Sequence, residues 1–138
     1  MRIEESVEIA CAPEAAWAVV SDPMNDARWC HKVKSVKPAG EDQWKVMHKP
    51  VPLRAPMAMT TIRRDRQEPT RLTLDQEDEA STFRVQYVLE PSATGTLFTQ
   101  ISEFEWKTLP RVLHGTFARG VRRDVQRQLR DLKELLER

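Results

Sequence analysis

The feature that most restricts the fold is a change in the spacing of apolar residues near residue 110. Before it, apolar and polar side chains alternate in several short runs, which is the pattern of strands with one buried face. After it, apolar residues recur at helical spacing and share an arc of about 120°. These residues are Phe117, Val121, Val125, Leu129, Leu132, Leu135 and Leu136. The sequence therefore predicts an antiparallel sheet followed by one long amphipathic helix.

The alternating runs are separated by short polar segments such as QEPT, EDEA and PSATG. Connectors of this kind are typical of antiparallel hairpins. The expected strands are 33–37, 43–49, 57–66, 71–76, 82–89 and 96–106. A further strand is expected at 2–9, in RIEESVEI, where Glu5 falls on the otherwise apolar side.

Two short helical segments are expected between the first strand and the rest. Pro13 suits the first turn of a helix, and Glu14 is favourably placed beside its N-terminus. The Asp22–Pro23 step ends this helix, and a second helical turn reaches Trp29. The order of elements predicts the α+β class, with a curved antiparallel sheet wrapped around the C-terminal helix, as a single domain over residues 1–138.

Composition narrows the functional classes. The chain has 138 residues, 40% hydrophobic and 31% charged, and a net charge of +1, which argues against a dedicated nucleic-acid binder. No apolar run is long enough to span a membrane, and the N-terminus does not resemble a signal peptide, so we expect a cytoplasmic protein. Cys11 and Cys30 are not spaced for zinc, and no cofactor motif is present, so we expect no metal and no cofactor.

Several motifs together resemble those of the START-like, or SRPBCC, helix-grip superfamily, in particular its bacterial polyketide cyclase/dehydrase-like branch. They are VEIACAPEAAWAVVSDP, then Trp29, then YVLEPSATGT with Gly95-Thr96, and the terminal LRDLKELLE. The resemblance implies a deep cavity between the sheet and the last helix that holds a small apolar or aromatic molecule, polyketide-like or lipid-like. It does not imply one reaction, because members range from carriers to cyclases.

Alternation along the strands predicts which side chains face this cavity. The predicted ligand-contacting residues are Trp29, Trp44, Val46, Leu74, Gln76, Phe83, Val85, Phe98, Gln100, Ser102, Phe104 and Phe117. Polar groups on this face need partners, because an unpaired buried one costs about 1–3 kcal/mol. Water or a ligand with carbonyl or hydroxyl groups would supply them, and so would internal hydrogen bonds in a filled core.

His48 and Tyr87 are the candidate catalytic residues. His48 shares a strand face with Trp44 and Val46, and an imidazole suits proton transfer at neutral pH. The alternative is a histidine at a strand end, bonded to the backbone. Pro50, Pro52 and Pro56 follow it, and their fixed φ angles predict a stiff lip beside the cavity mouth.

Three functions fit these patterns. The favoured one is a carrier of a small hydrophobic or aromatic ligand. The second is a polyketide cyclase or dehydratase in the same cavity, with His48 as base and Tyr87 as hydrogen-bond donor. The third is an interaction module acting through a helix face formed by Arg119, Arg123, Arg127 and Arg130. A solvated helix face with i,i+4 ion pairs is the favoured explanation of these arginines. The sequence does not choose between a monomer and a homodimer.

Overall fold

All seven strands form one antiparallel sheet in the computed structural model, which describes residues 1–49 and 57–138. The strands are β1 (Arg2–Ile9), β2 (Val33–Gly40), β3 (Gln43–His48), β4 (Ala58–Gln67), β5 (Arg71–Glu77), β6 (Ser81–Ser92) and β7 (Gly95–Trp106). Their order in the sheet is β1-β7-β6-β5-β4-β3-β2, so every sequential pair from β2 to β7 is a hairpin and β1 joins at the β7 edge.

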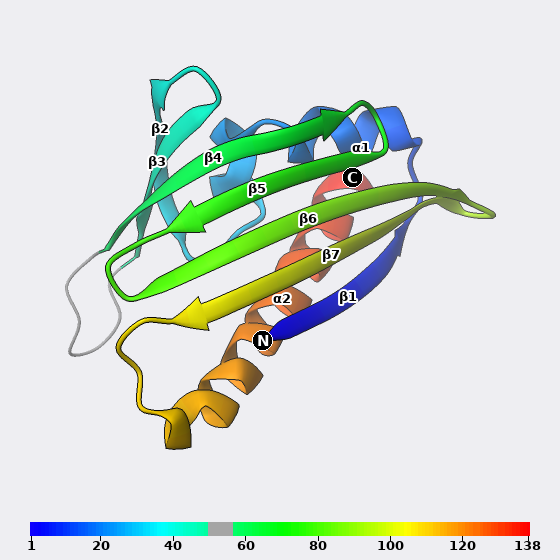
Figure 1. Cartoon of the computed structure of the whole chain (residues 1–138). Helices are drawn as coiled ribbons and strands as arrows, with labels where there is room; N and C mark the ends of the chain where they lie inside the picture. Colours follow the sequence, from blue (N-terminus) through cyan, green and yellow to red (C-terminus); the bar gives the residue numbers. More distant parts are fainter. Residues whose placement is uncertain (50–56) are drawn as a thin grey trace.

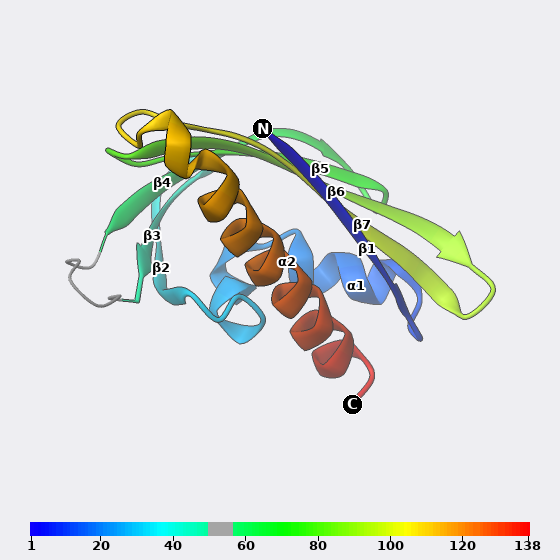
Figure 2. The same cartoon turned by 90° about the horizontal axis from the view of Figure 1, so that it is seen from below.

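The helices lie on the concave side of this sheet. They are α1 (Pro13–Val20), the 3-10 segments η1 (Pro23–Arg28) and η2 (Arg111–Leu113), and α2 (His114–Leu136). α2 crosses the sheet obliquely, and α1 and η1 lie on the same side of the sheet (Figures 1 and 2). This arrangement confirms the predicted helix-grip fold of the α+β class.

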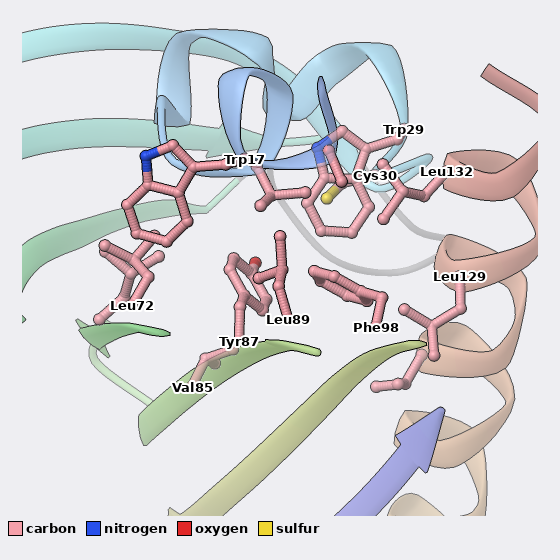
Figure 3. Packing of buried hydrophobic residues seen from close by; sticks show 14 of the residues in the cluster. Trp17, Trp29, Cys30, Leu72, Val85, Tyr87, Leu89, Phe98, Leu129 and Leu132 are labelled. Atoms are coloured by element: carbon pink, nitrogen blue, oxygen red, sulfur yellow. The ribbon is translucent and has the colours of Figure 1, made fainter. Parts of the chain in front are cut away.

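The C-terminal half of α2 supplies its buried side chains. Val125, Leu129 and Leu132 are buried in a core that also contains Trp17 of α1 and Trp29 (Figure 3). Burying each leucine side chain stabilises the fold by roughly 1.5–3 kcal/mol. The helical stripe therefore holds α2 against the sheet mainly through its second half.

Polar contacts fix α2 to β1 along its length. Glu5, which looked out of place on the apolar side of its strand, accepts hydrogen bonds from Arg122 Nη1 at 2.6 Å and Gln126 Nε2 at 3.2 Å. Further along, Lys133 Nζ donates to the carbonyl of Glu8 at 2.9 Å. The acidic residue on the inner face is thus an attachment point for the helix.

Gly95 allows the β6–β7 turn to approach the link between β1 and α1. Its φ is +145°, and a Cβ atom there would lie 2.6 Å from the carbonyl oxygen of Ile9 and 2.7 Å from that of Cys11. The next residue, Thr96, donates its hydroxyl to the same Cys11 carbonyl at 2.7 Å. Any larger residue at position 95 would push these segments apart.

The element boundaries differ from expectation in modest ways. The β6–β7 hairpin is longer than predicted and reaches Ser92 and Gly95, because the pairing continues through Pro91 at its turn end. The last helix starts at His114 after the short η2, with Pro110 at the N-cap of η2. The lip predicted at Pro50 to Pro56 lies outside the described residues. Within the described residues, no helix has the length and apolarity needed to span a membrane.

Candidate functional site: a cavity beneath the first half of the long helix

A cavity of about 530 Å³ lies between the sheet and the first half of α2. Its wall comes from β3 to β7, from α2, and from the segment around η1 and the start of β2. The lining residues used below are Asp26, Cys30, Lys32, Val46, His48, Gln76, Phe83, Val85, Tyr87, Gln100, Ser102, Phe117, Gly120, Val121 and Asp124. The cavity and the core therefore share the concave face, each beneath one half of α2.

The first half of α2 leaves this space open because of its residue types. Gly120 lines the cavity, and a Cβ atom added there would have nothing within 4 Å. One turn earlier, Phe117 also lines the cavity and is 46% exposed. The apolar stripe continues through this half, where Phe117 meets the sheet at the end of β7, through an edge contact with Trp106 at 6.1 Å between ring centroids.

The structure brings most of the predicted site residues together. On the cavity wall are His48, Tyr87, Val46, Gln76, Phe83, Val85, Gln100, Ser102 and Phe117. These residues come from four strands and one helix, and alternation placed the strand residues on the correct face. Ligand contact by them remains a prediction.

Five predicted ligand-contacting residues do not line this cavity. Trp29, Leu74 and Phe98 are fully covered by the core, at 1%, 1% and 0% exposure. Phe104 packs between Phe83 and Trp106, with ring centroids 5.1 Å from each. Trp44 lies near the β2–β3 turn under the Arg63 guanidinium. For the four residues on strands, alternation identified the face but not the position along the strand.

The clearest residue that sequence reasoning missed is Asp26. It lies in η1, lines the cavity and is only 5% exposed. Burial, with a smaller contribution from the negative charge of Asp22, raises its pKa to about 8. Asp26 lies three residues before Trp29, and residues three apart share one face of a 3-10 helix. This spacing is the one sequence signal that could have indicated that Asp26 is buried.

Tyr87 and Gln100 form a polar pair on the opposite wall. They face each other in the β6–β7 register and are 4% and 5% exposed. Gln100 donates its Nε2 to Ser102 Oγ at 3.4 Å, and its Oε1 has no partner among the described residues. Burial raises the pKa of the Tyr87 hydroxyl well above its usual value, and the nearby Asp26 charge adds to this.

Charged groups gather on another part of the cavity wall. Asp124 of α2 forms an ion pair with Lys32, and its Oδ1 lies 3.5 Å from His31 Nε2. His48 is half-buried nearby, and burial, followed by the positive charge of Lys32, lowers its pKa. The His48 imidazole is therefore held neutral near pH 7 and can accept a proton.

A larger and more open depression, about 1030 Å³, is lined by charged side chains of β4 to β7. Several of its charges are paired with one another: Arg64 and Arg84 both donate to Asp75, at 2.9 and 2.7 Å. The cavity under α2 suits an apolar ligand better. Among the described residues, no group of three or more histidine, cysteine, aspartate or glutamate side chains could hold a metal ion.

Solved structures with the same fold cover nearly the whole chain. A Chromobacterium violaceum protein aligns with TM-score 0.78 at 16% identity, covering 99% of this chain and 98% of its own. A Thermus thermophilus protein gives 0.78 at 15%, covering 99% and 97%. The Zhui aromatase/cyclase from Streptomyces gives 0.80 at 12%, covering 100% and 94%. These likenesses show a shared fold.

No curated protein matches the sequence significantly. The family described as "Polyketide cyclase / dehydrase and lipid transport" matches residues 1–137, which is nearly the whole chain. That match bears out the resemblance noted in the sequence. The chain belongs to the polyketide cyclase/dehydrase and lipid transport family of START-like proteins.

Proposed function

We propose that this protein binds a small hydrophobic or aromatic molecule, polyketide-like or lipid-like, in the cavity beneath the first half of α2 and acts as its carrier. The observation that carries the proposal is the cavity itself. Its volume of about 530 Å³ falls in the range of small-molecule sites, and its wall combines apolar side chains such as Val46, Phe83 and Val85 with a comparable number of polar and charged ones. The family description, which includes lipid transport, supports the same role.

Filling the cavity from the helix tests the proposal. Gly120→Leu would place a side chain in the empty space below α2, so we expect it to abolish binding while leaving the fold intact. Gly115→Leu is the matched control, because Gly115 lies on the same helix, does not line the cavity and has nothing within 4 Å of its Cβ position. Both changes also replace a helical glycine, and the gain in helix propensity should be larger at Gly120, because Gly115 lies in the first turn of α2.

The measurement is native mass spectrometry of freshly purified protein, with solvent extraction of any bound molecule, backed by titration with a naphthalene-based fluorescent probe. Wild type and Gly115→Leu should carry or bind an apolar molecule, and Gly120→Leu should not. An empty wild-type protein that also fails to bind the probe would overturn the proposal. Equal binding by all three proteins would mean that the ligand binds outside the cavity beneath α2.

A cyclase or dehydratase in the same cavity is the second candidate. The position of His48 favours it. This histidine has a lowered pKa and lines the same cavity as Tyr87. General base catalysis contributes about 10²–10⁴-fold in rate. His48→Gln should therefore reduce turnover of a polyketide-like substrate by at least about 10²-fold and change its affinity only a few-fold. Unchanged turnover in this variant would exclude His48 as the base.

A further inference from the structure

The start of α2 exposes apolar side chains to solvent. Val112 of η2 is 86% exposed, Leu113 is 40% exposed, and Phe117, one helical turn after Leu113, is 46% exposed. They are three of the five large apolar side chains that are exposed among the described residues. Single exposed apolar residues are ordinary, but a cluster of them in one place marks an interaction surface.

This cluster lies at a protruding end of the molecule. η2 and the first turn of α2 extend beyond the end of β7 and lie far from α1 (Figures 1 and 2). Internal contacts hold them in place, because the Trp106 ring lies 5.1 Å from the His114 ring and 6.1 Å from the Phe117 ring, between centroids. His114 Nε2 is also hydrogen-bonded to the carbonyl oxygen of Leu109 at 2.9 Å. The exposed apolar side chains are therefore presented on a fixed support.

The charges that this part of the chain carries are all positive. Residues 107–123 contain five basic side chains and no aspartate or glutamate. The basic residues are Lys107, Arg111, Arg119, Arg122 and Arg123. Two of them are neutralised, because Lys107 pairs with Glu77 at 2.7 Å and Arg122 pairs with Glu5 at 2.6 Å. The other three are exposed and form no ion pair among the described residues, so their charge is available to an anionic partner.

We propose that this end of the molecule is a docking surface for a membrane that contains anionic lipids. Val112, Leu113 and Phe117 enter the outer part of the lipid layer, and the arginines contact lipid phosphate groups. Segments that bind membrane interfaces combine apolar or aromatic side chains with basic ones in this way, and their apolar side chains reach about 5–10 Å into the layer. Arg119 follows Leu113 by six residues, about 9 Å along the helix, which places it at the level of the headgroups.

Other partners fit this surface less well. In a symmetric dimer, the same patch of both chains is in contact, so Arg111 and Arg119 of one chain would face those of the other and repel them. An acidic protein would pair with the arginines, but a stable protein interface covers roughly 800 Å² per partner. The apolar side chains here occupy only η2 and the first turns of one helix. A fluid lipid layer needs no complementary shape to take up such a protruding end.

The test is co-sedimentation of the full chain with lipid vesicles. One vesicle is an equal mixture of phosphatidylcholine and phosphatidylglycerol, and the other is phosphatidylcholine alone. Each basic side chain near an anionic surface strengthens binding by about fivefold at low salt. Wild type should therefore bind the anionic vesicle at least about tenfold more tightly than the neutral one, and raised salt should weaken this binding. Gly120→Leu should bind like wild type, because docking does not require the cavity to hold a ligand.

Matched variants separate the apolar contribution from the electrostatic one. Val112→Glu should weaken binding to the anionic vesicle at least about tenfold, because an apolar side chain no longer enters the lipid. Val112 is almost fully exposed, so the change should not disturb the fold. Met24→Glu is its control, since Met24 is 46% exposed but belongs to η1, away from this end. Arg119→Glu should also weaken binding at least about tenfold, whereas Arg130→Glu, about 16 Å further along α2, should change it less than about twofold.

Tryptophan fluorescence shows which part of the molecule touches the lipid. Trp106 packs against Phe117 at the proposed docking surface, whereas Trp17 and Trp29 are buried in the core. Brominated phosphatidylcholine in the anionic vesicle should therefore quench part of the emission of wild type. Trp106→Phe should remove this quenching.

Four results would contradict the membrane assignment. The first is no binding to either vesicle at low salt, which would leave the carrier proposal unaffected. The second is an equal loss of binding in Val112→Glu and Met24→Glu, or quenching that persists in Trp106→Phe, which would place the lipid contact elsewhere. The third is a dimer in analytical ultracentrifugation that Val112→Glu dissociates, which would show that a second copy covers the patch. The fourth is binding to soluble polyglutamate as tight as to vesicles and unchanged by Val112→Glu, which would indicate an acidic protein partner.

Discussion

At the scale of single residues, the proton of Asp26 has a measurable effect on stability. The pKa of its carboxyl is about 8 in the folded protein and near 3.8 when exposed. Between these values the folded state holds one proton more than the unfolded state, so stability falls as pH rises. The slope from this residue is up to about 1.4 kcal/mol per pH unit from roughly pH 4 to pH 8.

Asp26→Asn should remove this slope. As pH increases, the unfolding free energy of wild type should fall relative to that of the variant. The difference should become constant above about pH 8. Urea unfolding at several pH values measures it, and other titrating groups cancel because both proteins contain them. Parallel stability curves would mean that Asp26 is ionised, or exposed, in the folded state.

Gly95 offers a second prediction at this scale. Alanine there would combine a φ of +145° with contacts under 3 Å to the backbone of Ile9 and Cys11, so we expect a loss of about 2 kcal/mol or more. Gly40 has a similar φ of +141°, but the nearest atom to its Cβ position is 3.7 Å away. Gly40→Ala should cost clearly less in thermal or urea unfolding, and equal costs would rule out the close approach as the cause.

At the scale of elements, α2 has a first half that lines the cavity and a second half that holds the core together. Leu132 is fully buried, so Leu132→Ala should cost about 2–5 kcal/mol. Val121 borders the cavity and is partly buried, so Val121→Ala removes fewer contacts and should cost less than about 1.5 kcal/mol. Chemical unfolding checks both, and similar costs would indicate that no cavity separates α2 from the sheet.

The same division explains which parts of the site could be predicted from sequence. Period-two alternation in the long strands β6 and β7 correctly placed Tyr87 and Gln100 on the inner face. It could not separate Phe98, beneath the core half of α2, from Gln100, beneath the cavity half. That boundary depends on where α2 crosses the sheet. Asp26 was missed because η1 is too short to show a period.

At the scale of the whole molecule, an unfilled cavity means that ligand binding should stabilise the fold. A ligand at 100 times its Kd adds about 2.7 kcal/mol, which for a domain of this size raises Tm by several degrees. A thermal shift with 2-acetylnaphthalene checks this. Gly115→Leu should show the same shift, and Gly120→Leu should show none. A similar rise in both variants would place the bound probe outside the cavity.

The pairing of β1 with β7 has a consequence for synthesis on the ribosome. β1 is made before its partner strand β7, which follows about ninety residues later, because the hydrogen-bonded Ser6 and Thr99 are 93 residues apart. Throughout that interval, β1 and the edge strand of the sheet formed so far have backbone N–H and C=O groups without partners. Such edges are prone to pair with strands of other chains. A nascent chain that stalls before β7 should therefore depend on chaperones, and the charged residues Glu4 and Glu8 along β1 would help to keep it from aggregating.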